Sequence, residues 1–209
     1  MEAKFRDFPN LGIVELKLNE SIISYLWDLI EEAKSNSISV NKNLAGNITS
    51  SLKMNDKDNQ IFPICSQLIK SYLKKYGNPF HFLKSGDFKN TFFLDSLWVN
   101  FQFENEFNPI HTHSGAFSFV IWMKIPTDNN EQSELPIAKK SGNNLKISNF
   151  SFAYTNVIGQ IREQIYPMNK SIEGTLVMFP SRLVHQVYPF YNNCNERVSI
   201  SGNLSFSQE

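Results

Sequence analysis

An alternation of apolar and polar residues constrains the fold of this chain more than any other feature. The segment Leu97–Phe103 is apolar at every second position. A period of two is typical of a β-strand, whose side chains alternate between two faces. The other face of this strand carries Trp98, Asn100 and Gln102. If that face points inward, its polar groups need partners, which a bound ligand can supply; if it points outward, water supplies them.

Further segments with strand character follow along the chain, separated by turn residues. They are Phe8–Lys17 as an edge strand, Ser114–Ile125, Phe150–Thr155, Gly159–Tyr166, Gly174–Pro180, Arg182–Pro189 and Arg197–Phe206. Many short strands with turn signals between them predict an antiparallel sandwich or a small barrel. The polar residues 127–146 are expected to form a long connection of the kind that often becomes a lid.

Two amphipathic helices are expected ahead of the main β region. Apolar residues recur at spacings of three and four in both segments, so each helix has one apolar face that can pack on the outside of a sheet. The first helix is expected to begin at Asn19-Glu20-Ser21 and to end near Ala33. The second is expected over Asn59–Lys75, with a stop at Gly77. Residues 34–58 between them read as a loop, with Asn41–Ser51 crossing near the edge of the core.

The 209 residues fit one domain, 1–209, in which a helical part of about 1–80 packs on a β core of about 94–206. Lys+Arg and Asp+Glu balance at 20 each, so no strong nucleic-acid signal is present. Cys65 and Cys194 are expected to be free thiols. The N-terminus lacks a signal-peptide core, and no apolar segment approaches the ~18 residues of a membrane span. We expect a cytoplasmic protein of open oligomeric state.

Three histidines stand in an order that has a chemical meaning. His111 and His113 are two residues apart, so on an extended chain both can reach one metal ion. His185, far downstream, would complete a set of three and leave positions for a co-substrate and oxygen. Imidazole suits iron, zinc, copper and nickel, so the donors alone do not name the metal. The fourth histidine, His81, is interpreted as structural.

An arginine downstream of these histidines adds a second function to the predicted site. The Arg197 guanidinium can bind a carboxylate through two parallel hydrogen bonds, and Ser199 on the same strand face can donate to the same oxygen. Asn100 and Gln102 are candidates to line the same pocket. The sequence therefore predicts a mononuclear metal site with an anchor for an acidic co-substrate, and no catalytic residue beyond the metal centre.

The ordered motifs resemble those of the iron(II)- and 2-oxoglutarate-dependent oxygenases, closest to a small prolyl-hydroxylase-like branch of bacteria and phages. They are Phe107-Asn108-Pro109-Ile110-His111-Thr112-His113, Phe179-Pro180-Ser181-Arg182-Leu183-Val184-His185-Gln186-Val187-Tyr188-Pro189-Phe190 and Glu196-Arg197-Val198-Ser199, within about residues 94–206. The resemblance implies a double-stranded β-helix, a distorted jelly roll, flanked by helices. It also implies that His111 and His185 bind iron(II), and that Arg197, assisted by Ser199, binds the far carboxylate of 2-oxoglutarate.

The activity implied by the resemblance is hydroxylation of a C–H bond in a peptidyl or small-molecule substrate. O2 and 2-oxoglutarate would be consumed, and succinate and CO2 released. If the gene belongs to a phage, the enzyme would work in the cytoplasm of the host cell. Two other functions agree with the residues. One is a non-catalytic jelly-roll module for binding, or associated with a virion. The other is a three-histidine enzyme of the cupin type that does not use 2-oxoglutarate.

One residue departs from the pattern of the family. Most members have Asp or Glu where His113 stands, and a third neutral ligand would leave the iron more positively charged. We expect His113 to be the third ligand, because residues i and i+2 share a face. The alternative is that His113 turns away and that water, or a carboxylate such as Glu104 or Glu106, binds in its place.

Overall fold

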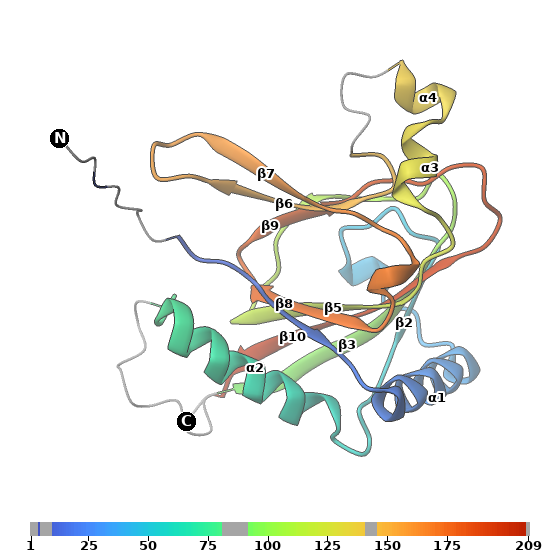
Figure 1. Cartoon of the computed structure of the whole chain (residues 1–209). Coiled ribbons are helices and arrows are strands. Elements are labelled where there is room, and N and C mark those ends of the chain that lie inside the picture. The colour runs from blue at the N-terminus through green and yellow to red at the C-terminus, as the bar shows by residue number, and fades with distance from the viewer. Residues whose placement is uncertain (1–3, 5–9, 81–91, 141–145, 208–209) are drawn as a thin grey trace.

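The computed structural model of the chain describes residue 4 and residues 10–80, 92–140 and 146–207. Two β-sheets face each other, and two long helices cover the outer face of the larger sheet (Figure 1). The elements are β1 Val14–Lys17, α1 Glu20–Asn36, η1 Asn41–Asn43, β2 Ser50–Lys53, α2 Ile61–Tyr76, β3 Phe92–Gln102, β4 Asn108–His111, β5 Phe117–Lys124, α3 Asn129–Ser133, α4 Pro136–Lys139, β6 Phe150–Thr155, β7 Ile161–Tyr166, η3 Lys170–Ile172, β8 Thr175–Pro180, β9 Val184–Val187 and β10 Arg197–Phe206.

The order of the strands defines a double-stranded β-helix with flanking helices, as the motifs implied. The larger sheet has six strands in the order β1-β8-β5-β10-β3-β2, and the smaller has four in the order β4-β9-β6-β7. The strand pairs are antiparallel. From β3 onward the chain passes back and forth between the two sheets, so residues far apart in sequence meet in the space between them.

The two long helices have defined ends. The Asn19 side chain accepts a hydrogen bond from the backbone N–H of Ile22 at 3.0 Å and caps α1. This helix ends at Ser37, which has a left-handed φ of 52°, so it runs slightly beyond the predicted end at Ala33. The carboxylate of Asp56 accepts from backbone N–H groups at the start of α2. This helix ends at Gly77, the predicted stop, with a φ of 78°.

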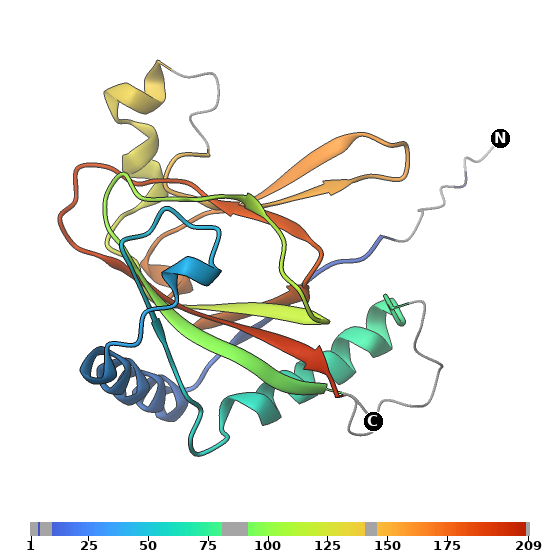
Figure 2. The ribbon, with the colours of Figure 1, turned by 180° about the vertical axis from the view of Figure 1, so that it is seen from behind.

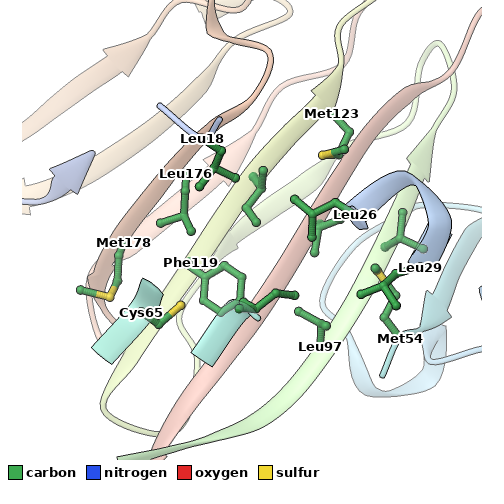
Figure 3. Close-up of a cluster of buried hydrophobic side chains, with 14 of the residues drawn as sticks. Leu18, Leu26, Leu29, Met54, Cys65, Leu97, Phe119, Met123, Leu176 and Met178 are labelled. Carbon is green, nitrogen blue, oxygen red and sulfur yellow. The ribbon is translucent and has the colours of Figure 1, made fainter. Parts of the chain in front are cut away.

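The apolar side chains form two clusters, one on each face of the larger sheet. The first lies between the helices and that sheet and includes Leu26, Cys65 and Phe119 (Figure 3). Burial there raises the pKa of the Cys65 thiol to about 12, whereas Cys194 is exposed; both thiols are free, as expected. The second cluster lies between the two sheets and includes Trp122 and Phe179.

The structure differs from the expected elements mainly in the polar segments. Ser50–Lys53, within the segment expected to be loop, forms β2, because β3 offers its edge for pairing. The expected connection 127–146 contains the short helices α3 and α4, and its residues 141–145 lie outside the described part. Residues 8–9 of the predicted edge strand, and His81, also lie outside the described part. Among the helices that are described, none combines the length and the apolar character needed to cross a bilayer.

Candidate metal centre and co-substrate pocket

A cavity of about 200 Å³ lies between the two sheets. Its walls come from β3 and β10 of the larger sheet, from β4 and β9 of the smaller sheet, and from the segment around η1. Seen from behind, η1 lies between the two sheet layers (Figure 2). The seven residues that the sequence singled out for a metal or a co-substrate all line this cavity: Asn100, Gln102, His111, His113, His185, Arg197 and Ser199.

The pairing of β4 with β9 brings the distant histidine to the first one. His111 and His185 are direct partners in this register, and their ring centroids lie 4.2 Å apart. His113 follows the end of β4, and its backbone N–H donates to the carbonyl of Ser181 at 2.9 Å. That hydrogen bond folds the chain back, so the third ring also turns into the cavity. Sheet pairing and one turn thus assemble three imidazoles.

The ring nitrogens are close enough to share one ion. The Nε2 atoms of His113 and His185 lie 3.1 Å apart, and one ligand atom from each of the three histidines lies within 4.8 Å of the others. Two imidazole nitrogens bound at right angles, each about 2.1 Å from a metal ion, are about 3 Å apart. The group His111, His113 and His185 therefore has the spacing of a metal-binding cluster.

Two of the rings have their protonation fixed by backbone carbonyls. Nδ1 of His111 lies 2.6 Å from the carbonyl of Pro109, and Nδ1 of His185 lies 2.9 Å from that of Leu183. A carbonyl only accepts, so each Nδ1 carries the proton and each Nε2 keeps its lone pair. An imidazole that donates its other N–H to a carbonyl is the usual arrangement of a metal-binding histidine.

The environment also keeps the three rings neutral. Burial, together with the neighbouring His111, lowers the pKa of His185 to about 3 and that of His113 to about 4. The pKa of His111 is also lowered, because burial lowers it by more than the hydrogen bond to the Pro109 carbonyl raises it. A histidine must be neutral to bind a metal, so this cluster is ready to bind one without first losing protons.

Neither of the acids considered as an alternative ligand lies at the cluster. Glu106 accepts from the backbone N–H of Phe103 at 2.8 Å and binds the side chain and backbone N–H of Thr49, so it closes a loop. Glu104 is exposed. Within the described part of the chain, the group of His, Cys, Asp and Glu that could hold a metal contains the three histidines alone.

Arg197 is a buried cation at the same cavity. Its side chain donates to the carbonyl of Ser148 at 2.7 Å and to the Gln102 amide oxygen at 3.3 Å, and it stacks on Phe190 at 5.1 Å. Its Nε has no hydrogen-bond partner, and no acid of the described residues forms an ion pair with it. Burial lowers its pKa to about 9, so the guanidinium stays charged at neutral pH. A buried charge of this kind is stabilised by a bound anion.

The other pocket candidates hold the wall of the cavity in place. Gln102 bridges Arg197 and the carbonyl of Glu106, to which its amide donates at 2.6 Å. The Asn100 amide oxygen accepts from the buried Ser51 hydroxyl at 2.8 Å. Ser199 pairs with Asn100 across the two strands and lines the cavity beside Arg197. The polar face of β3 therefore points inward.

Some cavity residues could not be found from the sequence. Ser148, which binds Arg197 with both its carbonyl and its hydroxyl, has a left-handed φ of 65° and lies in a polar connection that carries no motif. The Asn41–Gly46 segment reaches the cavity only because the chain folds over the sheet edge. Trp122 lies in the cluster between the sheets and also lines the cavity, and its apolar strand indicates only the first of these positions.

The chain is similar to known proteins in sequence and in fold. A protein-family model described as "Putative 2OG-Fe(II) oxygenase" matches residues 96–203, just over half of the chain. No curated protein sequence matches this chain. Solved structures that are similar include a prolyl-4-hydroxylase of Pseudomonas putida, with a TM-score of 0.54 and 12% identity, over 95% of this chain and 94% of that one.

Two further solved structures extend the comparison. An oxidoreductase of the 2OG-Fe(II) oxygenase family from Burkholderia pseudomallei has a TM-score of 0.52 and 12% identity, over 93% of this chain and 85% of that one. A prolyl hydroxylase from Trichoplax adhaerens was solved in complex with a hypoxia inducible factor oxygen degradation domain peptide fragment. Its TM-score is 0.51 at 12% identity, over 93% of this chain and 83% of that one. At such identities the likeness establishes the fold.

Proposed function

The chain belongs to the 2OG-Fe(II) oxygenase family, an enzyme family that uses iron(II) and 2-oxoglutarate, and from this premise we propose that it hydroxylates a C–H bond. The substrate is peptidyl or a small molecule, O2 is the oxidant, and succinate and CO2 are released. One observation carries the proposal. Three neutral imidazoles and a buried guanidinium without an acidic partner among the described residues line one cavity.

In this proposal His111, His113 and His185 hold the iron. The donor set fits, because imidazole nitrogen is a good ligand for iron(II) and each lone pair is available without loss of a proton. Bound iron(II) supplies the redox chemistry that couples decarboxylation of 2-oxoglutarate to hydroxylation. The carbonyls of Pro109 and Leu183 hold two of the rings in orientation. His113 takes the place that an acid has in most members.

Arg197 binds the far carboxylate of 2-oxoglutarate, and Ser199 donates to the same group. The fit rests on the Nε of Arg197, which has no hydrogen-bond partner, and on the charge of its guanidinium, which has no acidic partner among the described residues. One bound carboxylate accepts from the Nε and compensates the charge. Gln102 and Ser148 hold the guanidinium in place through its other nitrogens. Asn100 orders the neighbouring wall through Ser51. These residues orient the co-substrate.

A peptidyl substrate has support from one relative. The prolyl hydroxylase from Trichoplax adhaerens was solved with a peptide fragment, and its fold is similar to that of this chain. A small-molecule substrate stands beside it in the proposal.

The test is formation of succinate from 2-oxoglutarate by the purified chain with iron(II) under air, compared with the same mixture under nitrogen. We expect oxygen-dependent succinate, lost in the His185→Ala variant. An activity that persists in Arg197→Ala and needs no 2-oxoglutarate would identify a cupin-type enzyme instead. A chain that binds neither iron(II) nor 2-oxoglutarate would be the non-catalytic module.

A further inference from the structure

One edge of the larger sheet is only partly covered. The register of β2 on β3 runs from Ser50 opposite Phe101 to Lys53 opposite Trp98. The chain then turns away, after a last hydrogen bond from the backbone N–H of Met54 to the carbonyl of Leu97 at 2.9 Å. β3 continues for several residues beyond this point, to Phe92, paired with β10 along its other edge. Within the described ranges, no strand pairs with that last part of β3 on the β2 side.

A groove runs along this uncovered edge and leads to the metal cavity. The groove has a volume of about 870 Å³, and five consecutive residues of β3, Phe93–Leu97, line it. At its far end it shares residues with the metal cavity, including Trp98, Thr112 and His113. The Trp98 and His113 rings lie 6.0 Å apart there. A molecule in the groove therefore reaches the imidazole cluster by passing between β3 and the turn that carries His113.

The uncovered edge has a chemical preference. A free strand edge presents backbone N–H and C=O groups in a regular row, and an extended peptide matches that row with its own main chain. Five residues of strand extend about 16 Å at ~3.3 Å per residue, far more than one amino acid spans. Leu94 and Ser96 lie on opposite faces of the sheet, because Leu94 packs against the cluster under the helices and the Ser96 hydroxyl accepts from the Asn203 side chain on the other face, while Phe93 is exposed.

A β-bulge limits what can pair with this edge. The register on β10 passes from Asn203 opposite Ser96 to Leu204 opposite Leu94, so Asp95 has no partner on β10. A bulge increases the local twist, and an exposed charge discourages the pairing of long flat strands. A short, flexible segment can still follow the edge, whereas the edge strand of another folded sheet cannot.

We propose that the substrate is a short extended segment of a polypeptide that adds as a strand to the uncovered edge of β3, along Phe93–Leu97. The part of the segment beyond Trp98 then enters the metal cavity, where its C–H bond is hydroxylated. The inference rests on the proposed function and chooses the peptidyl substrate over the small molecule. It also assigns the groove beside β3 as the substrate channel.

The probe is a display library of short linear peptides of random sequence, selected on the full chain with iron(II) and 2-oxoglutarate under nitrogen. Selected peptides are then added under air. We expect them to increase succinate formation and to gain the mass of one oxygen atom. Hydrogen exchange of the complex should show new protection of the backbone amides of residues 93–97, a readout that does not depend on activity.

A matched pair of variants separates main-chain pairing from side-chain contacts. Asp95→Pro removes the backbone N–H of the residue that has no partner on β10, at a bulge that tolerates proline, whereas Asp95→Ala keeps that N–H. We expect peptide binding to weaken about tenfold or more in Asp95→Pro and to change little in Asp95→Ala. Affinity for 2-oxoglutarate should be the same in both. If Asp95→Pro fails to fold, peptides methylated at single backbone nitrogens make the same comparison from the ligand side.

The two proposals fail differently. Peptides that bind Asp95→Pro and wild type equally, and are insensitive to backbone methylation, would overturn the strand addition. Succinate formation stimulated by small molecules and by no peptide would overturn the substrate class and leave the oxygenase intact. A wild-type chain that neither binds nor consumes 2-oxoglutarate would overturn the proposed function itself.

Discussion

At the scale of single residues, the cavity brings together three neutral imidazoles and one charged guanidinium. The buried group of His111, His113 and His185 is neutral, and Nε2 of His113 lies 3.1 Å from Nε2 of His185. Arg197 keeps its charge although it is buried, and the hydrogen bonds that it donates to Gln102 and Ser148 satisfy only part of its guanidinium. One end of the cavity thus attracts a cation and the other an anion.

Iron(II) should stabilise the fold through the histidines. An ion present at about a hundred times its dissociation constant adds about 2.7 kcal/mol, which raises the Tm of a chain of this size by roughly 5–10 °C. We expect this rise, measured under nitrogen, to disappear with a chelator and to be absent in His185→Ala. In His113→Asp, which adds a negative ligand, iron should bind at least as tightly. A wild-type Tm that does not change when iron(II) is added would contradict this.

Loss of Arg197 should act on the co-substrate more than on the metal. Arg197→Ala removes the charge that binds the far carboxylate and should weaken 2-oxoglutarate binding by about a hundredfold, or ~3 kcal/mol. Arg197→Lys keeps a charge without the planar pair of donors, so its affinity for 2-oxoglutarate should lie between those of wild type and Arg197→Ala. Calorimetry with iron(II) under nitrogen measures both. The exposed Arg182, which does not line the cavity, provides the control Arg182→Ala, with unchanged affinity expected.

At the scale of elements, the site depends on how neighbouring strands meet. β4 and β9 bring two histidines into register, and the turn from β4 to β5 aims the third. On the outer face of the smaller sheet, Gln186 follows His185 and donates to Glu163 on β7 at 2.9 Å. Lys146 pairs with the same carboxylate. The strand that carries the distal histidine is thus tied to β7 from behind.

The turn after His113 should tolerate no side chain at Gly115. This glycine has a φ of +91°, and a Cβ there would lie 2.9 Å from the backbone oxygen of Leu204. Gly159 has a φ of +78° with nothing within 4 Å. Gly115→Ala should therefore destabilise the fold by about 2–4 kcal/mol and weaken iron binding, against about 1 kcal/mol for Gly159→Ala. Urea unfolding of both variants checks this; equal losses would contradict it.

The Glu163 network should make part of the stability depend on pH. Burial raises the pKa of Glu163, but hydrogen bonds from Lys146, Ser151 and Gln186 lower it more, so the net shift is downward. A lowered pKa in the folded state gives stability that is present above the unfolded value of about 4.3 and is lost as the pH falls through the folded value. Glu163→Gln should cost about 1 kcal/mol at neutral pH and nothing at low pH. Unfolding measured across that range shows whether the two curves converge.

At the scale of the whole molecule, the helices and the sheets share one apolar cluster. Buried residues of α1 and α2 pack with those of β3, β5, β8 and β10, and Figure 1 shows both helices across the outer face of the larger sheet. We propose that residues 1–209 form one domain, with the helical part about 1–80 on the core about 94–206. The groove beside β3 lies where these two parts meet, since Met54 and Phe62 line it together with β3.

One domain should unfold as one unit. Helix signal in far-ultraviolet circular dichroism reports on the helical part, and tryptophan fluorescence reports on Trp98 and Trp122 of the β core once Trp27 of α1 is replaced by Phe. We expect both signals to change at the same urea concentration. Cys65→Ala provides a control that destabilises the shared cluster by roughly 1–2 kcal/mol and should move both curves together. Two separate transitions would show that the helical part and the β core are independent.

The sequence by itself determined the strands of the core, the two long helices, the family and the residues that meet at the cavity. These follow from the alternation around Trp98, from the three-and-four spacing of the helices and from the order of His111, His185 and Arg197, all of which are properties of the chain read in one dimension. Only the tertiary structure decided the rest. The short strand β2 depends on pairing with β3, and the Arg197 partner Ser148 comes from a connection without a motif. The edge beside the groove has no strand partner among the described residues because β2 ends early. Such features arise from which backbone edges meet in space, and local residue patterns carry no record of that.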